Sequence, residues 1–178
     1  MQLVTFTQNK NTRIGLRKDN DIIDLSQVAP ELPSDMLSFL EGGENTMQAA
    51  QAVQDSHTHY AVSDVHLECP ITVPPMILAI GLNYKAHAEG SKSKLPTEPI
   101  LFNKSSGCLQ GPNDKIIKPK LANKMDYECE VAMVIGREGK CIEEKEAQNY
   151  VFGYFIVNDI SDLEKILSSI GKILLSDK

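Results

Sequence analysis

The sequence lacks the features of membrane and secreted proteins. No apolar run approaches the roughly 20 residues that a transmembrane helix needs, and residues 1–6 have neither the basic segment nor the long apolar block of a signal peptide. We therefore expect a cytoplasmic protein that has no membrane partner, with a mitochondrial location as the alternative.

Basic charge and cysteine motifs are also scarce. There are 18 lysine and arginine residues against 24 aspartate and glutamate residues, a net charge of −6. Because phosphate binding needs a basic face, we expect no nucleic-acid partner. The cysteines form no CxxC motif, so neither a zinc site nor a disulfide framework is predicted. We expect reduced, mostly structural thiols at Cys69, Cys108, Cys129 and Cys141.

The first 70 residues have the pattern of a small α+β cap domain. Short apolar runs at 3–6, 13–16 and 21–25 alternate with turns, which predicts a β-meander. Residues 36–40 and 45–53 have the composition of helices. The segment shows no visible chemistry, and we interpret its polar residues as solvated surface.

The chain changes character at residues 70–75, where three prolines interrupt any regular element. The continuous apolar run 76–80 ends in Gly81 and predicts a buried strand that leads into a turn. Further strands are expected at 99–102, 128–135 and 154–157, and helix formers lie between the last two, at 143–150. Residues 71–161 are therefore predicted to form a second, β-rich domain, and the fold class is α+β.

Three carboxylates fall where strands are expected. Glu128 and Glu130 are two residues apart, so on a strand they point to one face, and Asp159 follows the run 155–158 at a strand end. A hard divalent cation with oxygen ligands would relieve the repulsion between them, which favours Mg²⁺, Mn²⁺ or Ca²⁺ over zinc. The alternatives are a solvent-facing acidic pair and an ordinary turn aspartate.

A histidine and a glutamate lie in the segment that follows the first strand of the second domain. Histidine side chains ordinarily titrate near neutral pH, and the neighbouring Glu89 could orient His87 as a general base. The alternative is a surface histidine, which is also our interpretation of His57, His59 and His66.

Taken together and in this order, five segments resemble the fumarylacetoacetate hydrolase family. The resemblance covers residues 1–161, including the cap of the family's two-domain members. The segments are Gly81-Leu82-Asn83-Tyr84 with His87, Pro99-Ile100-Leu101-Phe102-Asn103-Lys104, Asp126-Tyr127-Glu128-Cys129-Glu130, Val134-Ile135-Gly136-Arg137, and Gly153-Tyr154 with Asn158-Asp159-Ile160-Ser161.

This resemblance implies a mixed β-roll catalytic domain and a set of roles. Glu128, Glu130 and Asp159 match the family's metal ligands, with Mg²⁺ as the first expectation, and His87 matches its general base. Lys104 falls near the family's site, although it could equally pair with a structural carboxylate. The resemblance implies a small oxo-acid substrate, whose oxygens complete the metal shell. The reactions would be hydrolysis of acylpyruvate-type β-diketo acids, or decarboxylation or tautomerisation of oxaloacetate. It also implies a homodimer when the catalytic domain is complete.

The sequence departs from the family pattern in two places. The glutamate expected three residues after the histidine is replaced by Gly90, and Glu89 stands one position earlier. After Ser161 the family continues Ala-Arg-Asp, whereas this chain reads Asp162-Leu163-Glu164 and is expected to lack the rest of the catalytic domain. Residues 162–178 have the spacing of an amphipathic helix, which would cover the open core or bind a partner. The competing functional hypothesis is therefore a shortened, inactive family member that retains metal or partner binding.

Overall fold

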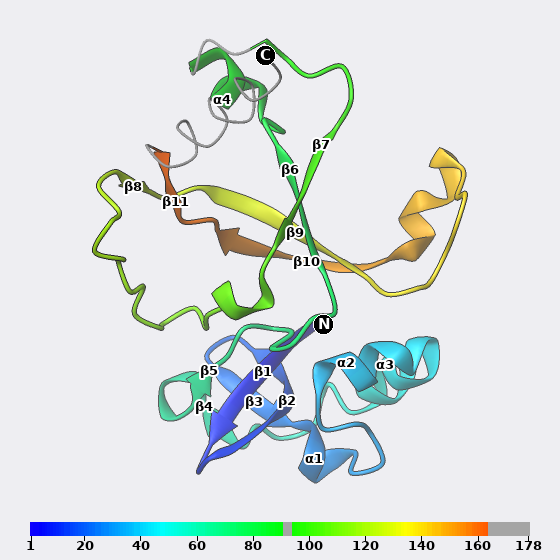
Figure 1. Ribbon diagram of the computed structural model, residues 1–178. Coiled ribbons are helices and arrows are strands. Elements are labelled where there is room, and N and C mark those ends of the chain that lie inside the picture. The colour runs from blue at the N-terminus through cyan, green and yellow to red at the C-terminus, as the bar shows by residue number, and fades with distance from the viewer. Residues whose placement is uncertain (91–93, 164–178) are drawn as a thin grey trace. The chain divides into compact units, whose positions relative to one another are not determined.

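The protein is described by a computed structural model that covers residues 1–90 and 94–163, with the side chains of residues 87, 89 and 90 excepted (Figure 1). Contacts divide the chain into two compact units, Met1–Asp114 and Lys115–Lys178. Each unit is considered by itself. The domain boundaries predicted near residues 70 and 161 stay a prediction.

The cap begins with the expected antiparallel meander. Strands β1 (Gln2–Gln8), β2 (Asn11–Lys18) and β3 (Asp21–Asp24) pair in sequence, and β4 (Tyr60–Ala61) and β5 (His66–Leu67) complete a sheet of order β4-β3-β2-β1-β5. Asn9 and Lys10 both have positive φ, as the tight turn between two twisted strands requires. The predicted meander is thereby confirmed.

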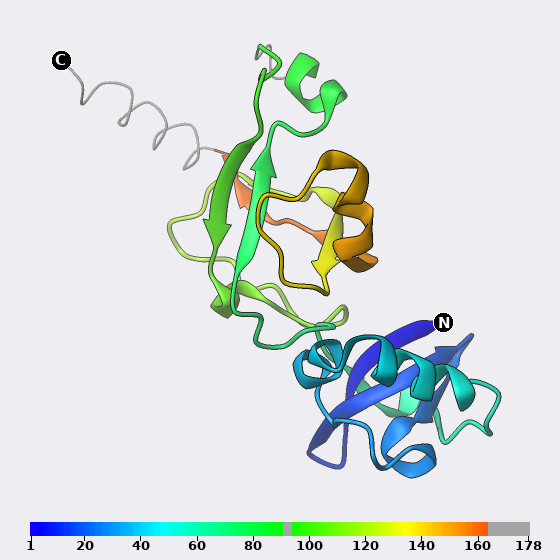
Figure 2. The ribbon, with the colours of Figure 1, turned by 90° about the vertical axis from the view of Figure 1, so that its right-hand side faces the viewer.

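Helices cover one side of this sheet. α1 (Leu25–Val28) follows β3 directly, and α2 (Met36–Glu41) and α3 (Gly43–Ala52) lie along the strands (Figure 2). The Asp35 side chain caps α2 by accepting a hydrogen bond from the Ser38 amide, which lowers the pKa of Asp35. The predicted helices at 36–40 and 45–53 are confirmed. Buried apolar side chains lie on both faces of the sheet, since Ile22 and Ile23 are neighbours on β3. The fully buried large apolar residues of the cap include Phe6, Ile14, Ile22, Ile23, Leu25 and Phe39.

A buried ion pair lies inside the cap. Arg13 is 7% exposed and Asp24 1%, and two guanidinium nitrogens lie 2.7 and 2.8 Å from one Asp24 oxygen. Ser26 and Gln27 donate further hydrogen bonds to the same carboxylate. Burial alone would raise the pKa of Asp24, but these bonds and the Arg13 charge outweigh it and hold that pKa below its usual range. The interpretation of the cap's polar residues as solvated surface is wrong for this pair.

His59 joins the same cluster through its ring. The Nδ1 atom accepts a hydrogen bond of 3.1 Å from the Asp24 amide, and the rings of His57 and His59 lie 4.4 Å apart. Burial lowers the pKa of His59, and the neighbouring His57 lowers it further, against the opposing pull of Asp24. The fold therefore favours the neutral ring, whose Nδ1 can accept.

The remainder of the first unit contains the first elements after the prolines. β6 (Ile77–Gly81) pairs antiparallel with β7 (Ile100–Lys104), and the two run side by side in Figure 2. The remaining short helices of this unit are η1 (Val62–Asp64), before the prolines, and α4 (Lys85–Gly90) and η2 (Ser106–Cys108), after them. The predicted strand at 76–80 is confirmed. Its predicted burial is wrong, because Leu78 is 57% exposed and residues along β6 alternate between exposed and half-buried.

The second unit is built on one antiparallel strand pair. β9 (Cys129–Ile135) pairs with β10 (Val151–Asn158), and β8 (Met125–Asp126) pairs with β11 (Ser161–Asp162). The predicted strands at 128–135 and 154–157 are confirmed, and the helix formers at 143–150 adopt the 3₁₀ helix η3 (Glu144–Tyr150). The predicted helix over 162–178 lies outside the described residues from 164 onward.

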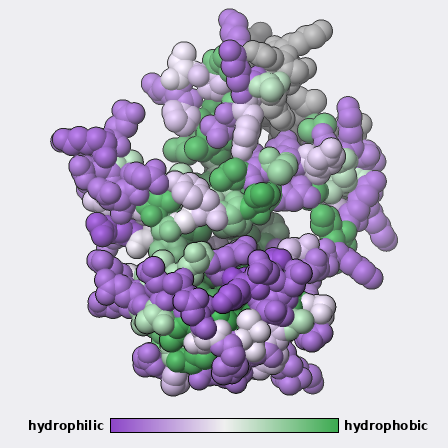
Figure 3. All heavy atoms as spheres, turned by 180° about the vertical axis from the view of Figure 1, so that it is seen from behind, coloured by the Kyte–Doolittle hydropathy of each residue, from purple (hydrophilic) through white to green (hydrophobic). Residues whose placement is uncertain are grey.

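One face of the β9–β10 pair is apolar and exposed. Figure 3 shows hydrophobic residues at the surface among hydrophilic ones. The other face of the pair is half-buried. Among the helices that the structure describes, none is long and apolar enough to cross a membrane. The large apolar side chains exposed on the strand pair are Val131, Met133, Ile135, Tyr154 and Ile156.

Candidate metal centre

The three candidate carboxylates are positioned by the register of the second unit. In β9 and β10, Cys129 lies opposite Asn158 and Glu130 lies opposite Val157. In β8 and β11, Asp126 lies opposite Ser161, so both ladders share one register. Between them the Asp159 amide donates a hydrogen bond of 2.8 Å to the Glu128 carbonyl. The register therefore places Asp159 directly across from Glu128.

Strand alternation then brings the side chains together. Glu130 in β9 and Glu128 just before β9 point to one face, and Asp159, just after β10, extends the corresponding face of that strand. One carboxylate oxygen from each of the three lies within 4.8 Å of the others, and all three residues are half-buried. Two acidic residues directly opposite each other on neighbouring strands destabilise a sheet. The arrangement thus has a local electrostatic cost that a cation between the carboxylates would remove.

The donor set fits a hard divalent cation. Carboxylate oxygens are the ligands that Mg²⁺, Mn²⁺ and Ca²⁺ prefer, whereas zinc favours nitrogen and sulfur. Cys129, the sulfur ligand nearest in sequence, belongs to the exposed set of β9 residues and alternates with the two glutamates. Three carboxylates would also leave several positions of a six-coordinate ion for water or a substrate.

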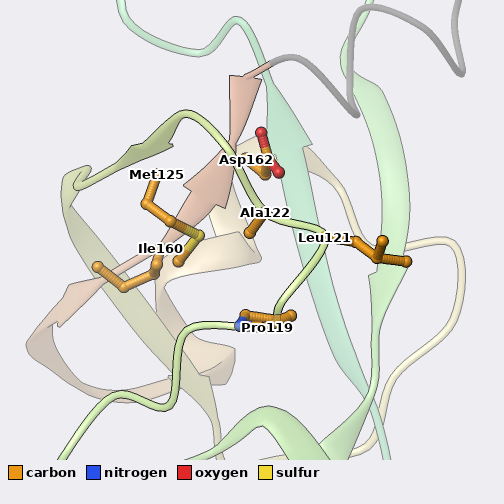
Figure 4. Close-up of a pocket in the computed structure, with 6 residues that line it drawn as sticks. All are labelled: Pro119, Leu121, Ala122, Met125, Ile160 and Asp162. Carbon is orange, nitrogen blue, oxygen red and sulfur yellow. The ribbon is translucent and has the colours of Figure 1, made fainter.

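A separate pocket lies a few residues away in the same unit. It has a volume of about 270 Å³, and the side chains that line it are mostly apolar (Figure 4). Ile160, Met125 and Asp162 alternate along their strands with the positions that carry the acidic cluster, so we do not assign this pocket to the centre. An Asp162 oxygen accepts a hydrogen bond of 3.2 Å from the Asn123 amide. The lining residues are Pro119, Leu121, Ala122, Met125, Ile160 and Asp162.

The predicted catalytic residues belong to the first unit. His87 and Glu89 lie in α4, and the structure describes only their backbone. Ala88, between them, is buried. Lys104 is the last residue of β7, half-buried and opposite Ile77. The structure therefore brings Glu128, Glu130 and Asp159 together, while the convergence of His87, Glu89 and Lys104 on them stays a prediction.

Sequence reasoning missed two local features. The pocket next to β8 and β11 was not predicted, because its lining combines residues 119–125 with Ile160 and Asp162, which are distant in sequence and share no periodic pattern. The exposure of the cysteines was also misjudged. All four are free, but only Cys69 is buried, so the interpretation as structural thiols is wrong for Cys108, Cys129 and Cys141. For Cys129 the available signal was its position between Glu128 and Glu130.

Comparisons with known proteins give a consistent result. The family described as fumarylacetoacetate (FAA) hydrolase C-terminal matches residues 76–170, more than half of the chain. Oxaloacetate tautomerase fahd2, mitochondrial, from Xenopus laevis is 39% identical over 183 residues. That match takes in 100% of this chain and 57% of the relative, so the chain spans little more than half the length of this curated relative.

Solved structures share the fold. Fumarylacetoacetate hydrolase from Exiguobacterium antarcticum is 25% identical with a TM-score of 0.74, covering 94% of this chain and 58% of its own. Maleylpyruvate hydrolase from a Sphingobium species, in complex with manganese(II) and pyruvate, is 23% identical with a TM-score of 0.73, covering 90% and 58%. The predicted α+β fold of fumarylacetoacetate hydrolase type is confirmed. On the family match and the shared fold, this chain belongs to the fumarylacetoacetate hydrolase family.

Proposed function

We propose that this chain is a metal-dependent enzyme of its family that acts on β-diketo or 2-oxo acids. The reaction would be hydrolysis of a carbon–carbon bond, as in acylpyruvates, or decarboxylation or tautomerisation of oxaloacetate. The observation that carries the proposal is the meeting of three carboxylate oxygens within 4.8 Å on the half-buried face of one strand pair. The names of the tautomerase and of the manganese-bound hydrolase support this substrate class.

Glu128, Glu130 and Asp159 would hold one divalent ion, Mg²⁺ in the first instance and Mn²⁺ or Ca²⁺ as alternatives. When bound, such an ion supplies a Lewis acid that polarises a carbonyl oxygen. The three residues supply the negative charge that retains the ion, and the rigid ladder beneath them fixes their spacing. A small oxo acid is the proposed partner because it carries keto and carboxylate oxygens next to each other.

The proton-transfer roles fall to the first unit. His87 would remove a proton from water or from the substrate, since an imidazole is the side chain best matched to that step near neutral pH. Glu89 would orient the ring in place of the glutamate expected at position 90, and Lys104 would neutralise a substrate carboxylate. A homodimer and a cytoplasmic or mitochondrial location complete the proposal. The mitochondrial alternative is favoured by the name of the Xenopus relative.

A second candidate function is metal or partner binding without turnover. Two sequence observations favour it: Gly90 stands where the family has a glutamate, and Asp162-Leu163-Glu164 stands where the family has Ala-Arg-Asp. The first change would remove an orienting partner of His87, and the second would remove the wall that closes the site. Loss of such positioning costs orders of magnitude in rate.

The test measures metal binding and turnover on the same preparation. Calorimetric titration with Mn²⁺ should give one weak site that Glu130→Gln abolishes and the matched control Glu144→Gln, in η3 of the same unit, retains. Turnover of oxaloacetate or of an acylpyruvate should be far below the roughly 10 per second typical of enzymes. A rate near that value that is lost on His87→Ala would exclude the second candidate. Equal Mn²⁺ binding by the chain and by Glu130→Gln would exclude the centre itself.

A further inference from the structure

Two cysteines of the first unit lie on chain segments that run alongside each other. Cys69 follows β5, and Cys108 ends η2, so the two are far apart in sequence. The segment after Cys108 packs on β5: a side chain at Gly111 would clash with the Leu67 carbonyl oxygen and lie 3.4 Å from the Glu68 Cα. The backbones are thus in direct contact.

A second contact fixes the direction of this approach. The Asp114 carboxylate lies 3.2 Å from His66 Nε2, one residue before Leu67. Later residues of the β5 segment therefore contact earlier residues of the 108–114 segment. His66 contacts Asp114, and Leu67 and Glu68 contact Gly111. This is an antiparallel approach. The next step in the same direction is Cys69 with Cys108.

Both sides of this approach are anchored. The Glu68 amide bonds to the Thr5 carbonyl, and Thr5 Oγ1 donates a hydrogen bond of 2.6 Å to the Pro70 carbonyl, so β1 holds the residues on either side of Cys69. On the other segment, the Gly111 amide donates a hydrogen bond of 2.7 Å to the Asp114 carboxylate. Neither cysteine sits on a free loop end.

The two thiols also differ in access. Cys69 is buried and Cys108 is exposed. Burial raises the pKa of the Cys69 thiol, a backbone hydrogen bond with Ile71 lowers it somewhat, and Cys108 raises it again. This agrees with the antiparallel approach of the two segments, which sets Cys69 beside Cys108. An oxidant reaches the exposed Cys108 thiol first. The buried Cys69 thiol can then react with the resulting sulfenic acid to form a disulfide.

We propose that Cys69 and Cys108 form a reversible intramolecular disulfide when the protein meets a hydroperoxide. Hydrogen peroxide oxidises the Cys108 thiol to a sulfenic acid and is itself reduced to water. The Cys69 sulfur then attacks the Cys108 sulfur. An S–S bond forms, the S–O bond breaks, and the hydroxyl leaves as water with the Cys69 proton. The bridge closes residues 70–107, which carry β6, α4 and β7, into a covalent loop against the cap.

The test uses a full-length Cys129→Ser/Cys141→Ser variant, which retains the pair as its sole thiols. After brief treatment with hydrogen peroxide, both thiols should disappear, and the intact mass should fall by two hydrogen atoms. A peptide map without reductant should join the peptides of Cys69 and Cys108, and dithiothreitol should restore both thiols. A protease cut between residues 70 and 107 should release separate fragments only after reduction.

Further variants provide the controls. In Cys108→Ser, peroxide should leave the Cys69 thiol intact, and in Cys69→Ser, dimedone should trap a sulfenic acid at Cys108. The proposal is overturned if dimedone traps Cys108 equally well while Cys69 is present. It is also overturned if the oxidised product of the double serine variant is a disulfide between two chains.

Discussion

Two groups of carboxylates in this chain have opposite surroundings. Asp24 in the cap is 1% exposed and receives hydrogen bonds from Arg13, Ser26 and Gln27, all within the same unit. The acidic cluster of the second unit instead sets Glu128 across from Asp159, half-buried, with Glu130 alongside. A buried carboxylate that is matched by a cation destabilises the fold when that cation alone is removed. Like charges gathered on one face indicate a place for an ion from solution.

The largest expected effect tests the structural half of this contrast. Arg13→Met should lower the free energy of unfolding by about 3–5 kcal/mol, because it leaves the Asp24 charge buried without its partner. Lys18→Met is the matched control on the same strand. Lys18 lies 3.8 Å from Asp55 with both side chains exposed, so its loss should cost less than about 1 kcal/mol. Urea unfolding followed by circular dichroism measures both.

A companion variant separates charge from packing. Arg13→Met/Asp24→Leu removes both charges, and it should recover much of the stability lost by Arg13→Met, since apolar replacement of a whole buried pair is often neutral. Equal instability of the single and double variants would mean that the ion pair is not the main contribution. Packing of Arg13 against Phe6, 4.7 Å from the guanidinium carbon to the ring centroid, and the hydrogen bonds that Asp24 accepts from Ser26 and Gln27 would then dominate.

The next effect tests the candidate metal centre without relying on turnover. Mn²⁺ at about 100 times its dissociation constant should stabilise the native chain by about 2.7 kcal/mol. Glu130→Gln should lose that gain. Without metal the same variant should be as stable as the native chain or more stable, by up to about 1 kcal/mol, because it relieves repulsion between neighbouring carboxylates.

The reversal of sign is the diagnostic result, measured by thermal unfolding with Mn²⁺ and with EDTA. Glu144→Gln removes an equal charge from η3 and should behave like the native chain in both conditions. If Glu130→Gln were destabilising in EDTA and still responded to Mn²⁺, the glutamate would be a structural residue and the ion would bind elsewhere.

The sequence predicted the second group of carboxylates better than the first. Alternation along a strand is local, so Glu128 and Glu130 could be assigned to one face from their spacing alone. The position of Asp159 opposite Glu128 needed only a common antiparallel register. Burial of Arg13 depends on what covers both faces of β2, where residues 13–16 are buried in succession. The segments that cover β2 are distant in sequence, so the hydrophobic pattern of β2 itself does not predict the burial of Arg13.

The remaining discrepancies have a related origin. The apolar run 76–80 correctly indicated a strand, but an apolar run records a preference for burial, whereas burial itself needs a surface that other segments supply. Leu78 is accordingly exposed in β6. The helix formers at 143–150 give a 3₁₀ helix rather than an α-helix, because propensity is a weak prior over a single short segment. The roles of His87, Glu89 and Lys104 rest on family resemblance and stay predictions.

The smallest effect concerns the protonation of His59 beside the buried pair. Because the pKa of His59 in the folded protein lies below its unfolded value near 6.5, the unfolded state takes up the proton first as the pH falls. The contribution of the neutral His59 ring to the free energy of unfolding is therefore complete above about pH 6.5. It is lost as the pH falls from there toward the pKa of His59 in the folded protein. Protonation also removes the Nδ1 acceptor for the Asp24 amide. His59→Gln keeps a hydrogen-bond acceptor and cannot titrate. Its free energy of unfolding, measured with urea from pH 8 to 5, should therefore fall less steeply below pH 6.5 than that of the native chain. Above about pH 7.5 the two proteins should differ by a constant amount. Parallel curves through the whole range would show that the His59 ring does not couple the pH to the Arg13–Asp24 cluster.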